Sequence, residues 1–182
     1  MKYRHLGKSG LEVSVIGLGT NNFGGRMDFN ESREVISASI DEGVNFIDTA
    51  NIYSHGNSEE IIGRALAGRR EDVLIATKFG ELWEPGPHGK GGSRKHLMDC
   101  LEGSLRRLQT DYVDLYQVHC QDTETPIEET LRALDDVVRQ GKVRYIGLSN
   151  FDPWRIADAQ WSAKHNGFTQ FISSQPEYSM LE

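Results

Sequence analysis

The chain has 182 residues, a length that predicts one domain able to bury enough surface to fold without disulfides. With 20 basic and 27 acidic residues its formal net charge is −7, which argues against a basic surface for nucleic-acid backbones. No apolar run approaches the ~18 residues of a membrane span, and the first residues carry no signal-peptide core. Cys100 and Cys120 form neither a disulfide framework nor a zinc motif, so we expect a protein of the reducing cytoplasm.

Short apolar segments alternate with amphipathic helical patterns along the chain. A small hairpin is predicted first, from Tyr3–Leu6 and Leu11–Val13 around a glycine-containing turn. The predicted strands that follow are rich in Val, Ile, Leu and Phe: Val13–Thr20, Asn45–Ala50, Val73–Lys78, Val113–His119, Val143–Asn150 and Phe171–Tyr178.

Helices are predicted between these strands from apolar periodicity and capping signals. They run near Glu31–Glu42, from Asn57 to Gly68, from Ser93 through a leucine stripe to Leu108, from Pro126 to Gln140, and from Asp152 to near Gly167. Thr125 is expected to cap the fourth helix with Glu128 completing a capping box, and Gly141 is expected to end it.

The regular alternation of strand and helix predicts a parallel α/β sheet with right-handed crossovers. Such repetition suggests a (β/α)8 barrel, but the pattern stops after six strands, whereas a complete barrel typically needs ~250 residues. The sequence ends at Met180–Glu182, after the sixth strand, so we expect either part of a longer barrel or a fold that closes differently. We therefore predict one domain over residues 1–182, an incomplete (β/α)8 barrel of about six βα units plus the hairpin.

Polar side chains stand at the predicted carboxyl ends of the strands. Asp48 ends the second strand, Lys78 the third and His119 the fourth, and Tyr53 lies in the loop after Asp48. In a parallel barrel these ends converge on one mouth, where barrel chemistry occurs. Adjacent strands lie about 4.8 Å apart, so Asp48 and Lys78 can meet.

These four side chains predict proton transfer to a carbonyl oxygen. Free tyrosine, with a pKa of ~10, is a poor acid at neutral pH, and an ammonium group that stabilises its phenolate makes it a better one. Lys78, held charged by Asp48, is the candidate ammonium, and His119 can polarise the carbonyl with one N–H. Hydroxyl and amide groups that suit the carboxamide of a nicotinamide ring stand at the ends of later strands: Ser149, Asn150 and Gln175.

Several motifs together resemble those of the aldo-keto reductase superfamily over essentially the whole chain. They are Gly17–Thr20, Asn45–Ala50 with Tyr53, Ser58–Gly63, Ala76–Lys78, the segment from Leu108 to His119, and Gly141–Asn150. The resemblance implies a barrel that binds NADPH without a Rossmann domain. It also implies that hydride passes from nicotinamide C4 to an aldehyde or ketone and that Tyr53 protonates the oxygen, with Asp48, Lys78 and His119 completing the catalytic set.

The resemblance further implies contacts with cofactor and substrate. Asp48, Ser149, Asn150 and Gln175 would face the nicotinamide, and Thr20 and Asn21 are expected to approach it. Trp83 in the loop Gly80–Gly92 is expected either to line the substrate pocket with His119 or to anchor the loop by packing. The resemblance makes NADP(H) the expected cofactor. NAD(H) stays the alternative, because the family's last two barrel units, which hold most of the phosphate cradle, are not in this sequence.

Other reactive side chains are expected to be structural. No metal site is predicted, because His5, His55, His88, His96 and His165 show no ligand spacing, and these histidines are expected at the surface. Cys120 beside His119 has no evident base partner or oxyanion hole, so a nucleophilic role is not expected.

The sequence leaves three functions open. The first is a carbonyl reductase with a small-molecule substrate, no nucleic-acid partner and no membrane insertion. The second is an NADPH-binding regulatory protein like the potassium-channel β-subunits, which resemble this chain around Gly91–His96 but typically carry Asn in place of His119 and Arg in place of Asn150. The third is a truncated, non-catalytic remnant. An open barrel also exposes sheet edges, so we expect self-association or weak stability of the 182-residue chain.

Overall fold

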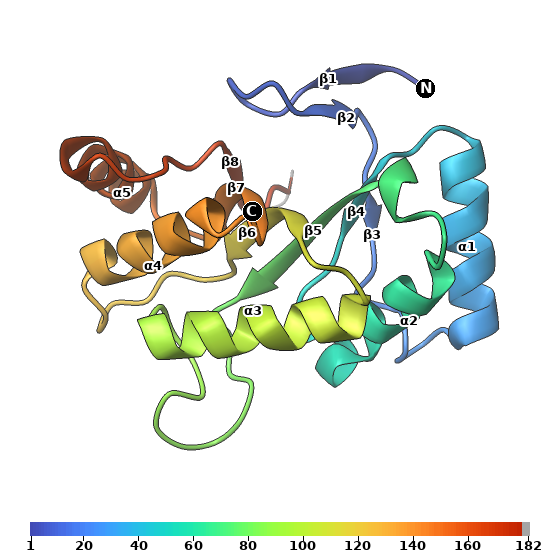
Figure 1. The fold of residues 1–182 in the computed structure, drawn as a ribbon, viewed down its shortest axis with the longest axis horizontal. Helices are drawn as coiled ribbons and strands as arrows, with labels where there is room; N and C mark the ends of the chain where they lie inside the picture. The colour runs from blue at the N-terminus through green and yellow to red at the C-terminus, as the bar shows by residue number, and fades with distance from the viewer. Residues whose placement is uncertain (180–182) are drawn as a thin grey trace.

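The computed structural model describes residues 1–179, and its centre is a curled sheet of six parallel strands with helices on its outer face (Figure 1). The strand order follows the chain: β3 (Leu18–Gly19), β4 (Phe46–Asp48), β5 (Leu74–Phe79), β6 (Val113–Val118), β7 (Val143–Ser149) and β8 (Ser173–Gln175). A separate antiparallel hairpin is formed by β1 (Tyr3–His5) and β2 (Glu12–Ser14). The chain is therefore a partial (β/α)8 barrel with an N-terminal hairpin, which confirms the predicted fold class.

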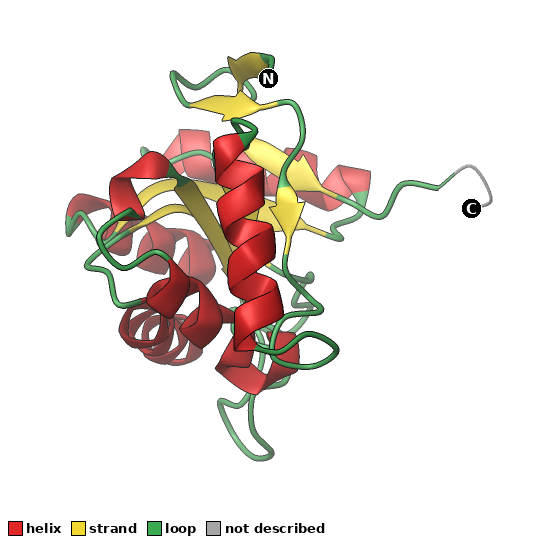
Figure 2. Cartoon of the chain, turned by 90° about the vertical axis from the view of Figure 1, so that its right-hand side faces the viewer, coloured by secondary structure: helices red, strands yellow, loops and turns green. Residues whose placement is uncertain are grey.

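One α-helix connects each strand of this sheet to the next: α1 (Phe29–Asp41), α2 (Asn57–Ala65), α3 (Arg94–Leu108), α4 (Ile127–Arg139) and α5 (Pro153–Asn166). Two short 3₁₀ turns flank α2, namely η1 (Tyr53–Gly56) and η2 (Arg70–Asp72). Figure 2 shows the helices outside the strands and the hairpin set apart at one end. None of these helices is long and apolar enough to cross a bilayer.

The hydrophobic core forms where the apolar stripes of the helices pack against the strands of the sheet. Leu97 and Leu101 of α3 and Leu131 and Leu134 of α4 are fully buried in one cluster with residues of the sheet. Burial of each such side chain stabilises the fold by roughly 1.5–3 kcal/mol. This burial fixes the helices on the outer face of the sheet. The ends of the strands can then hold polar side chains.

The hairpin packs against the amino ends of the sheet, opposite the long loop that follows β5 (Figure 1). The Ser14 N–H donates to Asn45 Oδ1 at 2.7 Å, and the Asn45 N–H donates to Ser14 Oγ at 3.2 Å, just before β4. Gly7 is left-handed, and a Cβ there would lie 2.1 Å from the carbonyl oxygen of Ile172, just before β8. The carboxyl ends of the strands thus lie at the other end of the sheet from the hairpin.

The predicted strands at the two edges of the sheet differ most from the observed ones. The predicted strand Val13–Thr20 is divided, because Ser14 is held by Asn45 as the last residue of the hairpin, and only Leu18–Gly19 pairs with β4. The predicted strand Phe171–Tyr178 is limited to Ser173–Gln175, because Pro176 has no N–H with which to continue the ladder.

The helix boundaries agree with their predicted stop and start signals in most places. The Ser93 hydroxyl caps α3 by accepting from the His96 N–H, left-handed Gly141 follows α4, and left-handed Gly167 ends α5. Helix α1 begins two residues before the predicted Glu31, because Asp28 caps it in a capping box with that glutamate.

Two predicted boundaries are wrong. Thr125 does not cap α4: Pro126 occupies the cap position without a side-chain bond, and the Thr125 N–H donates instead to Asp122 Oδ1 at 3.3 Å. The Asp122 carboxylate therefore holds the loop before the helix by accepting from its backbone. Helix α2 ends at Ala65 rather than at Gly68.

The prediction that His96 lies at the surface is also wrong. His96 is 3% exposed, because the loop between β5 and α3 folds back over its ring. Its Nδ1 lies 2.9 Å from the His88 carbonyl, and its Nε2 lies 3.4 Å from Cys100 Sγ. Burial lowers the pKa of His96 and raises the pKa of Cys100 to about 12.

Candidate active site

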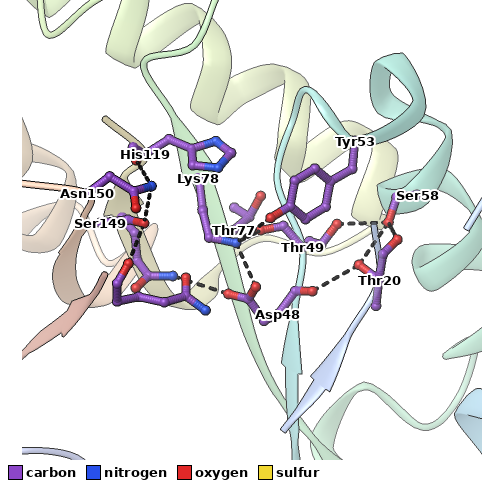
Figure 3. A network of polar contacts seen from close by, with 12 residues as sticks. Thr20, Asp48, Thr49, Tyr53, Ser58, Thr77, Lys78, His119, Ser149 and Asn150 are labelled. Carbon is purple, nitrogen blue, oxygen red and sulfur yellow. Dashed lines mark hydrogen bonds and ion pairs between the residues drawn. The ribbon is translucent and has the colours of Figure 1, made fainter. Parts of the chain in front are cut away.

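Lys78 is the centre of a polar cluster at the carboxyl ends of β4, β5 and β6 (Figure 3). Its side chain is almost fully buried, and its Nζ donates to Asp48 Oδ2 at 2.6 Å, to the Thr49 carbonyl at 3.0 Å and to the Tyr53 hydroxyl at 3.1 Å. An ammonium group has three donors and no acceptor. The Tyr53 oxygen therefore accepts from Lys78, and its own O–H is left to donate elsewhere.

Strand register places these groups on one face of the sheet. Asp48 pairs with Ala76, two residues before Lys78, and Lys78 pairs with Gln117 on the next strand. Residues two apart in a strand point to the same side, so the side chains of Asp48, Lys78 and Gln117 converge inside the barrel.

Gln117 is a member of this cluster that the sequence reasoning missed. It is 2% exposed, and its Nε2 donates to Asp48 Oδ1 at 3.3 Å, on the opposite oxygen from Lys78. Both oxygens of Asp48 are thereby engaged, which orients the carboxylate toward the ammonium. The available signal was spacing, because Gln117 lies in β6 two residues before His119, which directly follows that strand.

His119 lies beside Tyr53 with its ring edge-on, at 5.8 Å between ring centroids and 76° between planes. Burial lowers the pKa of His119, and the Lys78 ammonium lowers it further, so the imidazole is neutral at pH 7. Its Nδ1 is buried and has no hydrogen-bond partner in the part of the chain that the structure describes. A buried acceptor without a partner is tolerated better than a buried N–H, which favours the tautomer with the proton on Nε2.

A second polar group joins the ends of β6, β7 and β8 (Figure 3). Ser149 Oγ donates to the Gln175 carbonyl at 2.7 Å, and Asn150 Nδ2 donates to the His119 carbonyl at 3.1 Å and to Ser149 Oγ at 3.0 Å. The Gln175 residue is exposed, and its side-chain amide makes no hydrogen bond within residues 1–179. The structure therefore brings Ser149, Asn150 and Gln175 together next to His119.

Thr20 and Asn21, both predicted to approach the cofactor, differ in their exposure to solvent. Thr20 is fully buried; its hydroxyl donates to the Asp48 carbonyl at 2.9 Å and accepts from Ser58 Oγ at 2.9 Å. Asn21 is exposed in the turn that follows β3. In this structure Thr20 thus braces the backbone at Asp48 and has no free surface, whereas Asn21 is accessible.

Trp83 packs on the η1 turn, which begins at Tyr53. The indole ring stacks on His55 at 4.5 Å and 6° between planes, and the Arg107 guanidinium lies 4.8 Å from the ring centre. It also lines a cavity of about 410 Å³ between its loop and α3, together with Asn51 and His96.

A hollow of about 450 Å³ lies between the loops that follow β5 and β6. Its charged lining residues include Glu81, Lys90 and Asp122, and Cys120 also faces it. Burial and Glu81 raise the pKa of Cys120 to about 11, so this thiol is not a thiolate at neutral pH.

Comparisons with known proteins identify the family of the chain. The family model "Aldo/keto reductase family" matches residues 15–182. The whole chain is 42% identical to "Probable voltage-gated potassium channel subunit beta" of Arabidopsis thaliana, covering 56% of that protein. It is 43% identical to "Uncharacterized oxidoreductase YrpG" of Bacillus subtilis (strain 168) and 41% identical to "L-glyceraldehyde 3-phosphate reductase" of Escherichia coli (strain K12), covering 59% and 54% of them. The chain thus spans little more than half the length of these relatives, and it belongs to the aldo/keto reductase family.

Proposed function

We propose that this protein is an oxidoreductase that reduces an aldehyde or ketone to an alcohol, with NADP(H) as hydride donor and Tyr53 as general acid. The observation that carries the proposal is the Lys78 ammonium, which directs one N–H at the Tyr53 oxygen while Asp48 compensates its charge. That arrangement stabilises a phenolate, the form that Tyr53 takes when it has given up its proton.

A nicotinamide nucleotide fits the residues present at the ends of β7 and β8. A carboxamide has a donor and an acceptor. The side-chain amide of Gln175 offers the complement of each: it makes no hydrogen bond within residues 1–179, and Gln175 lies beside Ser149 and Asn150. When bound, the nucleotide supplies a hydride to the carbonyl carbon. The choice of NADP(H) over NAD(H) rests on the family resemblance.

The protein's own part in the reaction is proton transfer to the carbonyl oxygen. We assign Tyr53 as the donor, because its oxygen accepts from Lys78 and its O–H is available. His119 donates its Nε2–H to the carbonyl oxygen of the substrate and so stabilises the negative charge that develops on that oxygen. Asp48, held by Gln117, accepts from the Lys78 ammonium and compensates its charge.

Tyr53→Phe tests this assignment, because it keeps the ring and removes only the hydroxyl. We expect the turnover of a generic aldehyde to fall by about 10²- to 10⁴-fold, the usual share of a general acid. Calorimetric titration of the same variant with NADPH should give the wild-type Kd, and parallel titrations with NADH measure the preference. Equal turnover in Tyr53→Phe and wild-type protein would remove Tyr53 from this role.

A second candidate is a cofactor-binding regulatory subunit, favoured by the 42% identity to the Arabidopsis thaliana protein over the whole chain. The two proposals differ in turnover. NADPH binding without reduction of any aldehyde or ketone, together with co-purification of a membrane channel, would support the regulatory one. Both proposals place the protein in the cytoplasm, as the sequence predicts.

A further inference from the structure

Tyr53 stands at the start of a turn whose backbone is unfavourable for ordinary residues. The three residues after it are all left-handed, with φ of 48° at Ser54, 53° at His55 and 89° at Gly56. Left-handed backbone crowds the Cβ of Ser54 and His55 against the chain. Such a conformation persists only where surrounding contacts hold it.

The contacts that hold this turn come from two distant segments. His55 stacks flat on Trp83, which belongs to the loop after β5, and Arg107 of α3 lies over the same indole at 4.8 Å. A Cβ at Gly56 would lie 2.8 Å from Arg107 Cδ and 3.4 Å from Trp83 Cη2. Gly56 therefore lets both side chains close on the turn.

A buried ion pair fixes Arg107 in place. Its Nε donates to Glu59 Oε2 at 2.7 Å, and Glu59 is fully buried. Glu59 Oε1 accepts from the Thr77 hydroxyl at 2.5 Å, and Thr77 directly precedes Lys78 in β5. The contacts around the turn are thereby connected to the strand that carries the Lys78 ammonium.

We propose that Trp83 and Arg107 are positioning residues for Tyr53: together with His55 they form a clamp that holds the η1 turn so that the phenol stays on Lys78. The inference rests on the proposed general-acid role of Tyr53. It gives Trp83 a task different from substrate contact, which is one of the two roles expected from the sequence. A substrate-lining Trp83 acts mainly on the KM of the carbonyl, whereas a clamp acts on kcat through the placement of the proton donor.

Trp83→Ala is the kinetic test, and Trp161→Ala is its matched control. Trp161 forms an equivalent stack on His165, at 4.9 Å and 10° between planes, on α5 away from the site. We expect Trp83→Ala to lower kcat by about 10- to 100-fold, because small misplacements of a reacting group have effects of this size. The carbonyl KM and the Kd of NADPH should change little, Trp83→Phe should restore most of kcat, and Trp161→Ala should match the wild type.

Hydrogen exchange of the Ser54–Asn57 amides tests the clamp without any catalysis. Exchange there should accelerate by about 10-fold or more in Trp83→Ala, because the turn opens locally, and should stay at the wild-type rate in Trp161→Ala. His55→Ala is a second variant that removes the other half of the stack, and its exposed position leaves the core intact.

Unchanged exchange in both Trp83→Ala and His55→Ala would overturn the clamp, as would a raised KM with wild-type kcat. An inactive wild-type protein with accelerated exchange in both variants would instead contradict the proposed reductase function and leave the clamp standing as a structural device.

Discussion

Lys78→Met removes the central cation of the site while keeping a side chain of similar length. Lys78 is 1% exposed and the Asp48 side chain 14%, so water screens this pair little. Within the described residues, the variant leaves the Asp48 carboxylate only the 3.3 Å hydrogen bond from Gln117. Loss of one member of a buried ion pair costs about 3–5 kcal/mol, since the other charge stays buried. In a domain of this size that corresponds to a fall in Tm of about 6–20 °C.

A double-mutant cycle separates the ion pair from the general effect of substitution. Asp48→Asn alone leaves the ammonium with the Thr49 carbonyl and the Tyr53 hydroxyl. The double variant Asp48→Asn/Lys78→Met has no unpaired buried charge, so it should unfold at a higher urea concentration than Lys78→Met. Urea unfolding of the four proteins gives the coupling free energy. A cost below about 1 kcal/mol for Lys78→Met, or strictly additive single effects, would refute the argument.

Two further predictions concern buried side chains outside this pair. Burial lowers the pKa of His96 and of His119, where the Lys78 ammonium adds to the effect, so the unfolded chain binds more protons just below pH ~6.5. The free energy of unfolding should therefore fall as the pH drops through that range, and urea titrations of His96→Asn should show a shallower decline; an equal decline would contradict the burial of His96. Because burial raises the pKa of Cys100 to about 12, iodoacetamide should alkylate this thiol only after unfolding. Mass spectrometry that finds Cys100 alkylated at the same rate in native and unfolded protein would show that it is accessible.

Much of the fold could be predicted from the sequence because it depends on local periodicity. Apolar runs such as Val73–Ala76, which leads into β5, and the leucine stripe of α3 each indicate one element and the face that it buries. Their alternation is compatible with few topologies, so the parallel order of the sheet followed. The meeting of Asp48 and Lys78 was also predictable, because parallel strands end at the same edge.

The sequence by itself determined the family, the class of the fold and the strand ends that carry the polar cluster, since these depend on residue type and spacing along the chain. Only the tertiary structure decided that Gln117 completes the cluster, that His96 is buried, that Pro126 rather than Thr125 occupies the cap position of α4, and that Trp83 packs on His55. Each of these contacts joins a loop or side chain to a segment whose position depends on how the chain folds back on itself. Local patterns specify elements and faces, but the partner of a loop side chain is selected only when the whole sheet and its helices are packed.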